Sequence, residues 1–181
     1  LIIEGLKQLG HHVVAIYLDK EGRWHSDKKL ESLGFFQNPH SRAMFNKWHL
    51  DLEQSVGKLV FTRKGFFART MTIDCAFPAF HGQHGEDGTA QGLFELLNVP
   101  YVGCGVAASA ITMDKVLTKL LYQQHVIPTT RFIYFCRADW EKNRRDWIHT
   151  IKTCLRWPVF VKPSRLGSSI GIAKIHCQPD N

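Results

Sequence analysis

The sequence predicts an α/β protein with a largely parallel sheet in its first part and a smaller α+β lobe after it. Short β-branched runs alternate with runs whose apolar residues recur at helical spacing, which is the pattern of strand–helix–strand units. The chain has 181 residues, enough for one medium domain or two small ones. The pattern changes near Ala110–Asp114, so we expect one domain over residues 1–111 and a second over residues 112–181.

The residue pattern places the following segments before that boundary: a helix over 1–9, a strand over 12–18, loops and short elements over 24–57, short strands around a turn at 64–65, a strand over 73–80, a helix over 89–97 and a short strand over 100–103. Apolar residues at helical spacing define the first helix, and Gly10 is a natural stop for it. β-Branched residues define the strand that follows, and the DKEG sequence then turns the chain. Leu93, Leu96 and Leu97 share one face of the later helix, which the sequence NVP ends.

After the boundary the pattern predicts a helix over 113–124, a strand over 131–135, a helix capped by Asp139, a strand over 158–163 and a strand over 169–175. The first of these helices has an apolar side that we expect to be buried, formed by Met113, Val116, Leu117, Leu120 and Leu121. The second has apolar residues at the same spacing, namely Trp140, Trp147, Ile148, Ile151 and Leu155.

The formal net charge of +7 makes nucleic acid the first ligand to consider. The basic residues are dispersed, however, and the densest cluster, EKNRRD, carries its own acidic residues, as a solvated helix face does. A nucleic-acid partner is therefore not expected. An anionic small molecule such as a nucleotide fits the charge at least as well, because a phosphate-binding cleft also needs lysines.

Cysteine usage and hydropathy indicate the compartment. The five cysteines are widely spaced and include no C-x-x-C pair: Cys75, Cys104, Cys136, Cys154 and Cys177. This argues against a disulfide framework or a zinc ribbon and for a reducing compartment such as the cytoplasm. No run of about 18 apolar residues occurs, and the start has no basic flank or small-residue cleavage site, so we expect neither a membrane span nor a secretory signal.

The stretch HGQHGEDGTAQG, residues 81–92, places polar side chains among four glycines and is open to three interpretations. Two histidines and two acidic residues could surround a metal ion, but no cysteine is near and the glycines would make a floppy cage. As an anion site, the turn would set His81 beyond the end of a strand and direct N–H groups of the next helix at a small carboxylate. In the third interpretation Glu86 and Asp87 brace the turn or cap the helix, and the histidines face solvent.

The segment VFVKPSRLGSSIGI, residues 159–172, carries the strongest single signal. Lys162 precedes a loop that contains Gly167, Ser168 and Ser169, whose N–H and hydroxyl groups can surround phosphate oxygens. A lysine followed by a glycine-rich cover is one way to hold nucleotide phosphates, although the P-loop pattern itself is absent. The alternative is a β-hairpin with a lysine in solvent.

Two further features concern anion binding. Lys115 stands at the start of a helix, where an ammonium group opposes the helix dipole unless it meets an anion. Lys119, one turn later, is expected to face solvent. Gly103 and Gly105 begin a dinucleotide-type spacing, but the acidic residue required about 20 residues later is missing, so a crossover between lobes explains these glycines better.

Taken together, HGQHGEDGTAQGLFELLNVPYVG, MDK and FVKPSRLGSSIGI, in this order and at these intervals, resemble the D-alanine–D-alanine ligases of the ATP-grasp superfamily. The resemblance covers the chain from Cys75 onward, and three motifs in register are more specific than any one of them. It implies an N-terminal Rossmann-like (pre-ATP-grasp) domain with a parallel sheet, followed by the first part of an ATP-grasp α+β domain. It also implies ATP and Mg²⁺ as cofactors. In this family one D-alanine carboxylate is phosphorylated to an acyl phosphate, which the amine of a second D-alanine attacks.

The resemblance further implies roles for matched residues on the substrate side. His81 belongs to a turn near the first D-alanine, and Glu86 matches an acidic residue of the family. Ser168 matches a residue in a substrate-side hydrogen-bond network. The family is usually a homodimer through its N-terminal domain and works on small molecules in the cytoplasm, for peptidoglycan precursor synthesis.

On the nucleotide side, Lys115 and Lys162 match the lysines that contact ATP phosphates. Gly167, Ser168 and Ser169 match the loop that closes over those phosphates. No residue of the chain matches a metal ligand, because the family places its magnesium ligands and adenine clamp beyond the residue at which this sequence ends.

The chain departs from the family pattern at both ends, and Cys104 stands where a serine or asparagine is expected. It starts inside the helix that follows the family's first strand and glycine-rich turn, and it ends at CQPDN. We therefore expect a fragment that does not catalyse ligation alone. Three hypotheses stay open: a D-alanine–D-alanine ligase, a related ligase that uses D-lactate or D-serine as second substrate, and a non-catalytic nucleotide-binding remnant.

Overall fold

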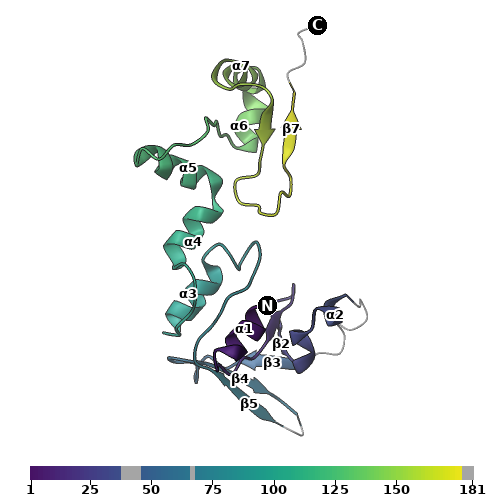
Figure 1. The fold of residues 1–181 in the computed structure, drawn as a ribbon. Helices are drawn as coiled ribbons and strands as arrows, with labels where there is room; N and C mark the ends of the chain where they lie inside the picture. The colour runs from purple at the N-terminus through teal and green to yellow at the C-terminus, as the bar shows by residue number, and fades with distance from the viewer. Residues whose placement is uncertain (38–45, 66–67, 177–181) are drawn as a thin grey trace. The chain divides into compact units, whose positions relative to one another are not determined.

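The computed structural model of the chain describes residues 1–37, 46–65 and 68–176 (Figure 1). Cys177 lies outside the described residues, and the other four cysteines are free thiols. Among the helices of the described ranges, none combines the length and the apolar character needed to cross a membrane.

The chain forms two compact units that interleave in sequence. The first unit comprises residues 1–77 and 93–102, and the second comprises residues 78–92 and 103–181. The chain therefore enters the second unit at residue 78, returns to the first at residue 93 and enters the second again at residue 103. The domain boundary expected between residues 111 and 112 stays a prediction.

The first unit contains a sheet and several short helices. Its elements in chain order are α1 (Ile2–Gln8), β1 (Ile16–Leu18), β2 (Trp24–Ser26), the 3₁₀ helix η1 (Lys28–Glu31), α2 (Leu33–Phe36), β3 (Lys47–Leu50), β4 (Leu59–Arg63) and β5 (Arg69–Ile73). The helix α3 (Thr89–Leu96) begins in the second unit and ends in the first. The expected first helix, the strand after it and the strands around the turn at 64–65 are thus present, with the strand after α1 shortened to three residues.

The expectation of a parallel sheet was wrong for the described strands. The five strands lie in sequence order, and every neighbouring pair is antiparallel. Strands β1 and β2 are joined by a tight turn, and β4 and β5 likewise follow each other closely, so only antiparallel pairing is open to them. The strand expected over residues 73–80 is reduced to one parallel bridge between Ala76 and Tyr101, which is also all that remains of the strand expected over 100–103.

The hydrophobic core of the described residues lies in the first unit. Its buried members are Leu30, Leu59, Val60, Phe61, Ala76, Phe94, Leu97 and Val99. Phe94 and Leu97 bring the end of α3 into this core, and the N–H of Gly57 donates to the carbonyl of Leu97 at 2.8 Å. Leu96, expected on the same face, is instead 81% exposed.

The turn between β1 and β2 is organised by Asp19. Its carboxylate accepts hydrogen bonds from the N–H groups of Glu21 and Arg23, from the guanidinium of Arg23 at 2.7 Å, and from His25 Nε2 at 2.8 Å. Burial raises the pKa of Asp19, but the hydrogen bonds from Arg23 and His25 outweigh it and hold the pKa well below its usual range.

Asp19→Asn is expected to destabilise the first unit in a pH-dependent way. Because the folded pKa is depressed, the stabilisation by the ionised carboxylate is present above the unfolded pKa of about 3.9 and is lost as the pH falls through the folded value. The difference in urea midpoint between wild type and variant should therefore be constant from about pH 5 to 7 and shrink below about pH 4. A difference that grows on acidification would contradict this account.

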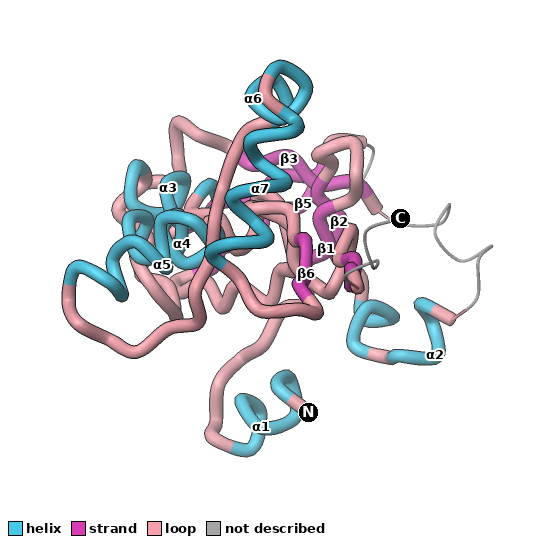
Figure 2. Tube along the Cα trace, turned by 90° about the horizontal axis from the view of Figure 1, so that it is seen from above, coloured by secondary structure: helices cyan, strands magenta, loops and turns pink. Residues whose placement is uncertain are grey.

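The second unit is mostly helical. After the start of α3 it contains α4 (Val106–Met113), α5 (Lys115–Gln124), α6 (Arg137–Lys142), α7 (Arg144–Cys154), β6 (Val159–Val161) and β7 (Ala173–Ile175). β6 and β7 form an antiparallel pair, and α6 and α7 lie beside it (Figure 2). Both of these strands and α5 were expected from the sequence.

The crossover expected around Gly103 and Gly105 is present, because the chain leaves the first unit at Val102 and enters the second at Gly103. Gly105 is then the N-cap of α4. Two other expectations for this unit were wrong. The segment 131–135 forms no strand. The helix expected from Asp139 is two helices, and Asp139 lies in the third position of α6, where its carboxylate accepts a hydrogen bond from the thiol of the N-cap residue Cys136 at 3.0 Å.

The apolar side of α5 is not buried by the described residues, contrary to expectation. Leu117, Leu120 and Leu121 are 45%, 38% and 39% exposed. Among the residues of this unit that the structure describes, the buried side chains are polar instead, namely Gln91, Ser109 and Asp114. The position of α5 is therefore fixed at its N-terminus by polar contacts, which are described next.

Candidate functional site

The HGQHGEDGTAQG turn is a compact, hydrogen-bonded structure. The N–H of Gly82 donates to Glu86 Oε2 at 2.5 Å, so the carboxylate of Glu86 closes the turn on itself. His81 Nδ1 lies 3.9 Å from Glu86 Oε1, and the His81 side chain is 90% exposed. Glu86 therefore braces the turn, as one of the three interpretations held, while the imidazole of His81 is accessible to a ligand.

Asp87 connects the turn to α3. Its carboxylate accepts hydrogen bonds from the N–H of His84 at 2.9 Å and from the N–H of Thr89 at 3.0 Å. Burial raises the pKa of Asp87, but these hydrogen bonds outweigh it and lower the pKa overall. The acidic residue thus satisfies an N–H group at the first turn of the helix, which is the capping role considered from the sequence.

Asp87→Ala is expected to destabilise the first turn of α3 by about 1 kcal/mol, because a helix loses its capping acceptor. The measurement is native-state hydrogen exchange of amides 88–92 in the full-length gene product. Asp87→Asn keeps an acceptor and should lose less than half as much. Equal protection in wild type and Asp87→Ala would show that the cap contributes nothing.

Two glycines of this turn stand where a side chain does not fit. A Cβ on Gly85 would lie 2.1 Å from Cβ of Phe80. Gly88 has φ +90°, and a Cβ there would lie 2.7 Å from the carbonyl oxygen of Val106 at the start of α4. The glycines therefore allow the turn to pack closely, whereas the sequence suggested that they would make it flexible.

The N-terminus of α5 is capped by a buried carboxylate. Asp114 Oδ1 accepts from the N–H groups of Val116 at 3.0 Å and Leu117 at 3.3 Å, and Asp114 Oδ2 accepts from Arg165 Nε at 2.9 Å. The Arg165 guanidinium, with the helix N–H groups, holds the pKa of Asp114 below its usual range despite burial. One carboxylate thus joins the helix to a loop 51 residues later in the sequence.

The glycine-serine loop connects β6 to β7. Lys162 directly follows β6, and its side chain makes no hydrogen bond or ion pair with any residue that the structure describes. Ser168 and Ser169 both have left-handed backbone angles, with φ 49° and 59°, a conformation that costs roughly 1–2 kcal/mol per non-glycine residue. With the hydrogen bond from the N–H of Ile170 to the carbonyl of Gly167 at 3.0 Å, these residues form a tight turn, and successive N–H groups of a turn can face an anion.

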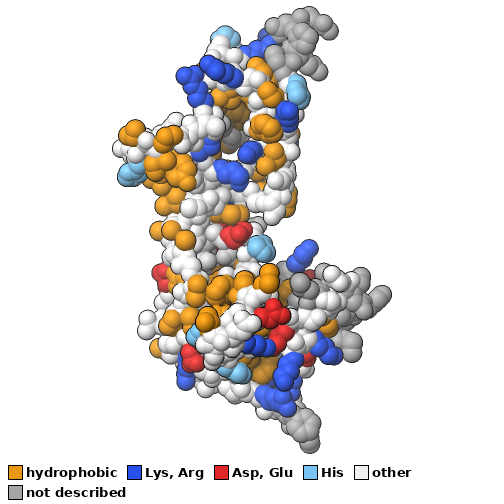
Figure 3. All heavy atoms as spheres, in the orientation of Figure 1, with side chains coloured by type: hydrophobic (Ala, Val, Ile, Leu, Met, Phe, Trp, Pro, Cys, Tyr) orange, Lys and Arg blue, Asp and Glu red, His pale blue; other side chains and the backbone are white. Residues whose placement is uncertain are grey.

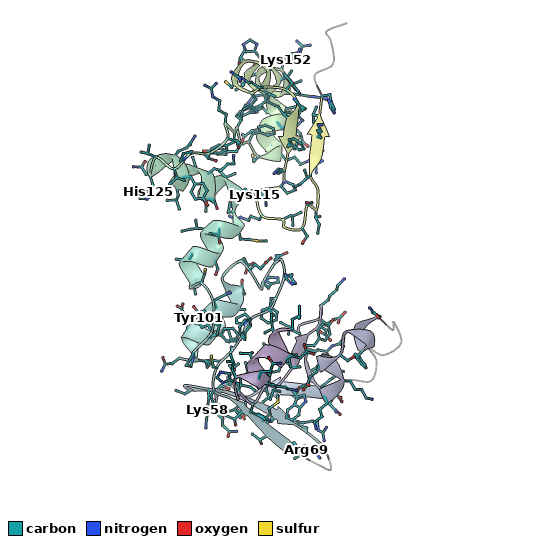
Figure 4. The ribbon with its side chains drawn as sticks, viewed as in Figure 1. Lys58, Arg69, Tyr101, Lys115, His125 and Lys152 are labelled. Atoms are coloured by element: carbon teal, nitrogen blue, oxygen red, sulfur yellow. The ribbon has the colours of Figure 1, made fainter. Side chains whose placement is uncertain are left out.

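This loop contacts two of the other predicted segments. The N–H of Lys115 donates to the carbonyl of Ser164 at 2.9 Å, and Lys115 Nζ donates to the carbonyl of Leu166 at 2.5 Å (Figure 4). A Cβ built on Gly167 would lie 4.0 Å from Glu86 Oε2. The structure thus brings the loop together with Lys115 and with Glu86. Convergence of His81 and Lys162 on the same ligand stays a prediction.

Lys119 is half-buried and hydrogen-bonded, whereas the sequence predicted that it would face solvent. Its ammonium donates to the carbonyl oxygen of Thr130 at 3.0 Å and to its hydroxyl at 2.7 Å, and lies 5.0 Å from the centre of the Phe132 ring. Burial, and secondarily the charge of Lys162, lowers the pKa of Lys119. Lys119 and Lys162 are therefore close enough to repel, and basic side chains lie together between α5 and the β6–β7 loop (Figure 3).

Sequence reasoning missed Lys119 and Arg165 as members of this group. Lys119 was expected in solvent, and no role was predicted for Arg165, because nothing in their sequence neighbourhood identifies a partner. The only signal for Arg165 in the sequence is its position inside the loop motif.

The residues present fit a nucleotide better than a metal ion. Lys115, Lys119 and Lys162 supply positive charge around the loop, and an ammonium has three donors, so Lys115 can hold Leu166 and still donate to phosphate. Within the described ranges no three His, Cys, Asp or Glu side chains come close enough together to hold a metal ion. The interpretation of residues 81–87 as a metal centre therefore finds no support in the described geometry.

Comparison with known proteins gives matches over most of the chain. The family described as D-ala D-ala ligase N-terminus matches residues 1–104, and the family described as D-ala D-ala ligase C-terminus matches residues 121–180. The D-alanine–D-alanine ligase of Thermosipho africanus is 39% identical over 166 residues, which make up 92% of this chain and 44% of that protein. The chain thus spans about half the length of the curated relatives that it matches.

Two solved structures have the same fold over nearly the whole chain. D-alanyl-alanine synthetase A from Vibrio cholerae superposes with a TM-score of 0.70 at 27% identity, covering 97% of this chain and 45% of that one. The VanG D-Ala:D-Ser ligase from Enterococcus faecalis superposes with a TM-score of 0.74 at 28% identity, covering 98% and 49%.

Proposed function

The chain belongs to the D-alanine–D-alanine ligase family, and from this we propose that it forms the phosphate-binding part of an ATP-dependent ligase that joins two D-alanines. The observation that carries the proposal is that the glycine-serine loop is hydrogen-bonded to Lys115 and that Gly167 of this loop lies near the carboxylate of Glu86. Residues of two segments far away in the sequence thus lie at one loop, and all three segments carry groups suited to a phosphate or a small carboxylate.

The proposed reaction has two steps. A carboxylate oxygen of the first D-alanine attacks the γ-phosphorus of ATP, which forms an acyl phosphate and releases ADP. The amine of the second D-alanine then attacks the acyl carbon, which forms the amide, releases inorganic phosphate and sheds one amine proton. Mg²⁺, when bound, would neutralise phosphate charge, and the described residues offer no ligand set for it.

The residues of this chain have distinct roles in the proposal. The ammonium groups of Lys115 and Lys162 stabilise charge on the transferring phosphoryl group. The N–H and hydroxyl groups of residues 167–169 cover the phosphates and exclude water that would hydrolyse the acyl phosphate. His81 donates a hydrogen bond to the carboxylate of the first substrate. Glu86 holds the turn that carries His81 next to the glycine-serine loop. Ser168 of that loop belongs to the hydrogen-bond network on the substrate side.

The test is phosphate release by the full-length gene product with ATP, Mg²⁺ and D-alanine. We expect release that depends on D-alanine and is not supported by L-alanine. ATP hydrolysis without any D-alanine dependence would remove the ligase proposal. The 181-residue chain alone should form no dipeptide.

A second candidate is a ligase that uses D-serine or D-lactate as its second substrate. It is favoured by the similarity to the VanG D-Ala:D-Ser ligase, which superposes on 98% of this chain with a TM-score of 0.74. Mass spectrometry of the product formed from equimolar D-alanine, D-serine and D-lactate separates the two. A dominant D-alanyl-D-alanine product would exclude this candidate.

The third hypothesis is a non-catalytic remnant. The nucleotide sequence of the gene distinguishes it from the two ligase candidates. An open frame beyond the codon for Asn181 that supplies acidic and asparagine ligands supports the enzyme, whereas a stop codon supports the remnant. We also propose a homodimer in the cytoplasm, which sedimentation of the full-length gene product and cell fractionation would test.

A further inference from the structure

The first half of the glycine-serine loop is attached to the start of α5 by three contacts. These are the N–H of Lys115 to the carbonyl of Ser164, the ammonium of Lys115 to the carbonyl of Leu166, and the guanidinium of Arg165 to the carboxylate of Asp114. We call these five residues the loop anchor. In two of these contacts the loop contributes a backbone carbonyl, which any residue at that position would provide. The third depends on one side chain, Arg165.

The environment of Asp114 makes this side chain specific. The Asp114 side chain is only 10% exposed, and a buried carboxylate needs a charged or hydrogen-bonded partner for each oxygen. Its Oδ1 is used by the helix N–H groups, and its Oδ2 faces Arg165 at 2.9 Å. The helix cap and the loop thus share one residue, so the direction of α5 and the path of the loop are coupled.

The strength of the ion pair between Arg165 and Asp114 indicates its role. The Arg165 side chain is 75% exposed, and ion pairs with an exposed member add little to stability because water screens them. Its effect is instead on the residues that follow at once, Gly167 to Ser169, whose left-handed angles at Ser168 and Ser169 are rarely populated in a free chain. A contact that holds such a loop before its ligand arrives reduces the entropy lost on binding.

We propose that Arg165 is a positioning residue for nucleotide binding: its ion pair with Asp114 holds the glycine-serine loop on α5 so that the loop and Lys115 meet the phosphates of ATP together. The inference rests on the proposed function, since it specifies how the phosphate-binding loop is held. Arg165 itself touches no phosphate in this proposal, and it acts through residues 167–169 and Lys115.

The experiment measures the affinity of the full-length gene product for Mg²⁺ and a non-hydrolysable ATP analogue, together with KM for ATP and kcat. Arg165→Met removes the guanidinium and keeps the aliphatic stem. We expect an affinity weaker by up to about fivefold and a similar rise in KM, with kcat within about twofold, because an ion pair with one exposed member holds the loop only weakly and the ordering cost is paid on binding and not in the chemical step. Arg165→Lys should recover part of the affinity.

A double-mutant cycle with Asp114→Asn tests whether Arg165 acts through Asp114. The double variant should bind no more weakly than Arg165→Met alone, since both substitutions remove the same contact. The matched control is Arg137→Met, which removes an exposed arginine that pairs with Glu141 at 2.8 Å on α6. It should leave affinity unchanged.

Two results would overturn the inference while leaving the proposed function standing: wild-type affinity in Arg165→Met, or losses in the double variant that multiply. If Asp114→Asn does not fold, the comparison of Arg165→Met with Arg165→Lys still tests the inference, because replacing an exposed arginine should leave the fold intact. Failure of the wild type to bind the analogue would instead overturn the proposed function as well.

Discussion

Replacing Lys162 by alanine in the full-length gene product is expected to lower kcat/KM for ATP by about 100-fold or more. The ammonium follows β6 directly and makes no hydrogen bond or ion pair among the described residues, so its donors remain available to phosphate. Its neighbour Lys119 directs two of its three donors at the oxygens of Thr130, so it can replace Lys162 only in part. Loss of Lys162 therefore removes most of the charge and donors that this strand end offers to the phosphoryl group.

The assay is D-alanine-dependent phosphate release, with wild type, Lys162→Ala and Lys174→Ala compared at varied ATP. Lys174 is an exposed lysine of β7, in the same two-stranded sheet, and pairs with Phe160 in the register. Its replacement controls for loss of net charge and should change kcat/KM less than about twofold. A Lys162→Ala effect as small as that of Lys174→Ala would remove Lys162 from the phosphate site.

Local patterns predicted the elements that depend on local sequence. The strands β4 and β5, the helix α3 and the strand β6 were expected because their residues alternate or recur over a few positions with clear punctuation. The strands β2 and β3 were expected only as unspecified short elements within residues 24–57, because the periodicity of that stretch is weak. The parallel sheet was wrongly expected because alternation of element types does not fix pairing, whereas the short connections do.

In the candidate site, likewise, residue types could be predicted from the sequence, whereas contacts between distant residues could not. The residue types at Lys115, Lys162 and Gly167 could be recognised because a motif is a local pattern. The contacts of Arg165 and Lys119 could not, since the first joins residues 51 apart and the second depends on where the segment after α5 returns. Capping by Asp87 was among the interpretations open from the sequence, because it depends only on the next two residues.

Gly88→Ala is expected to be the most disruptive single change in the HGQHGEDGTAQG turn, with a loss of about 3 kcal/mol in local stability. Two costs add. A left-handed backbone, here φ +90°, costs an alanine about 1–2 kcal/mol. The new Cβ would also lie 2.7 Å from the carbonyl oxygen of Val106, and relief of such overpacking costs about 1–3 kcal/mol because the contact is with backbone that cannot rotate away.

Gly82→Ala separates the two costs, since Gly82 has φ +78° but nothing within 4 Å of its Cβ position. It should lose only the first cost. Native-state hydrogen exchange of amides 82–96 in the full-length gene product measures both variants against wild type. Because the same turn carries His81 and Glu86, Gly88→Ala should also weaken D-alanine binding, whereas Gly82→Ala should do so less. Equal losses for the two variants would mean that backbone angle alone, and not contact with α4, requires a glycine at residue 88.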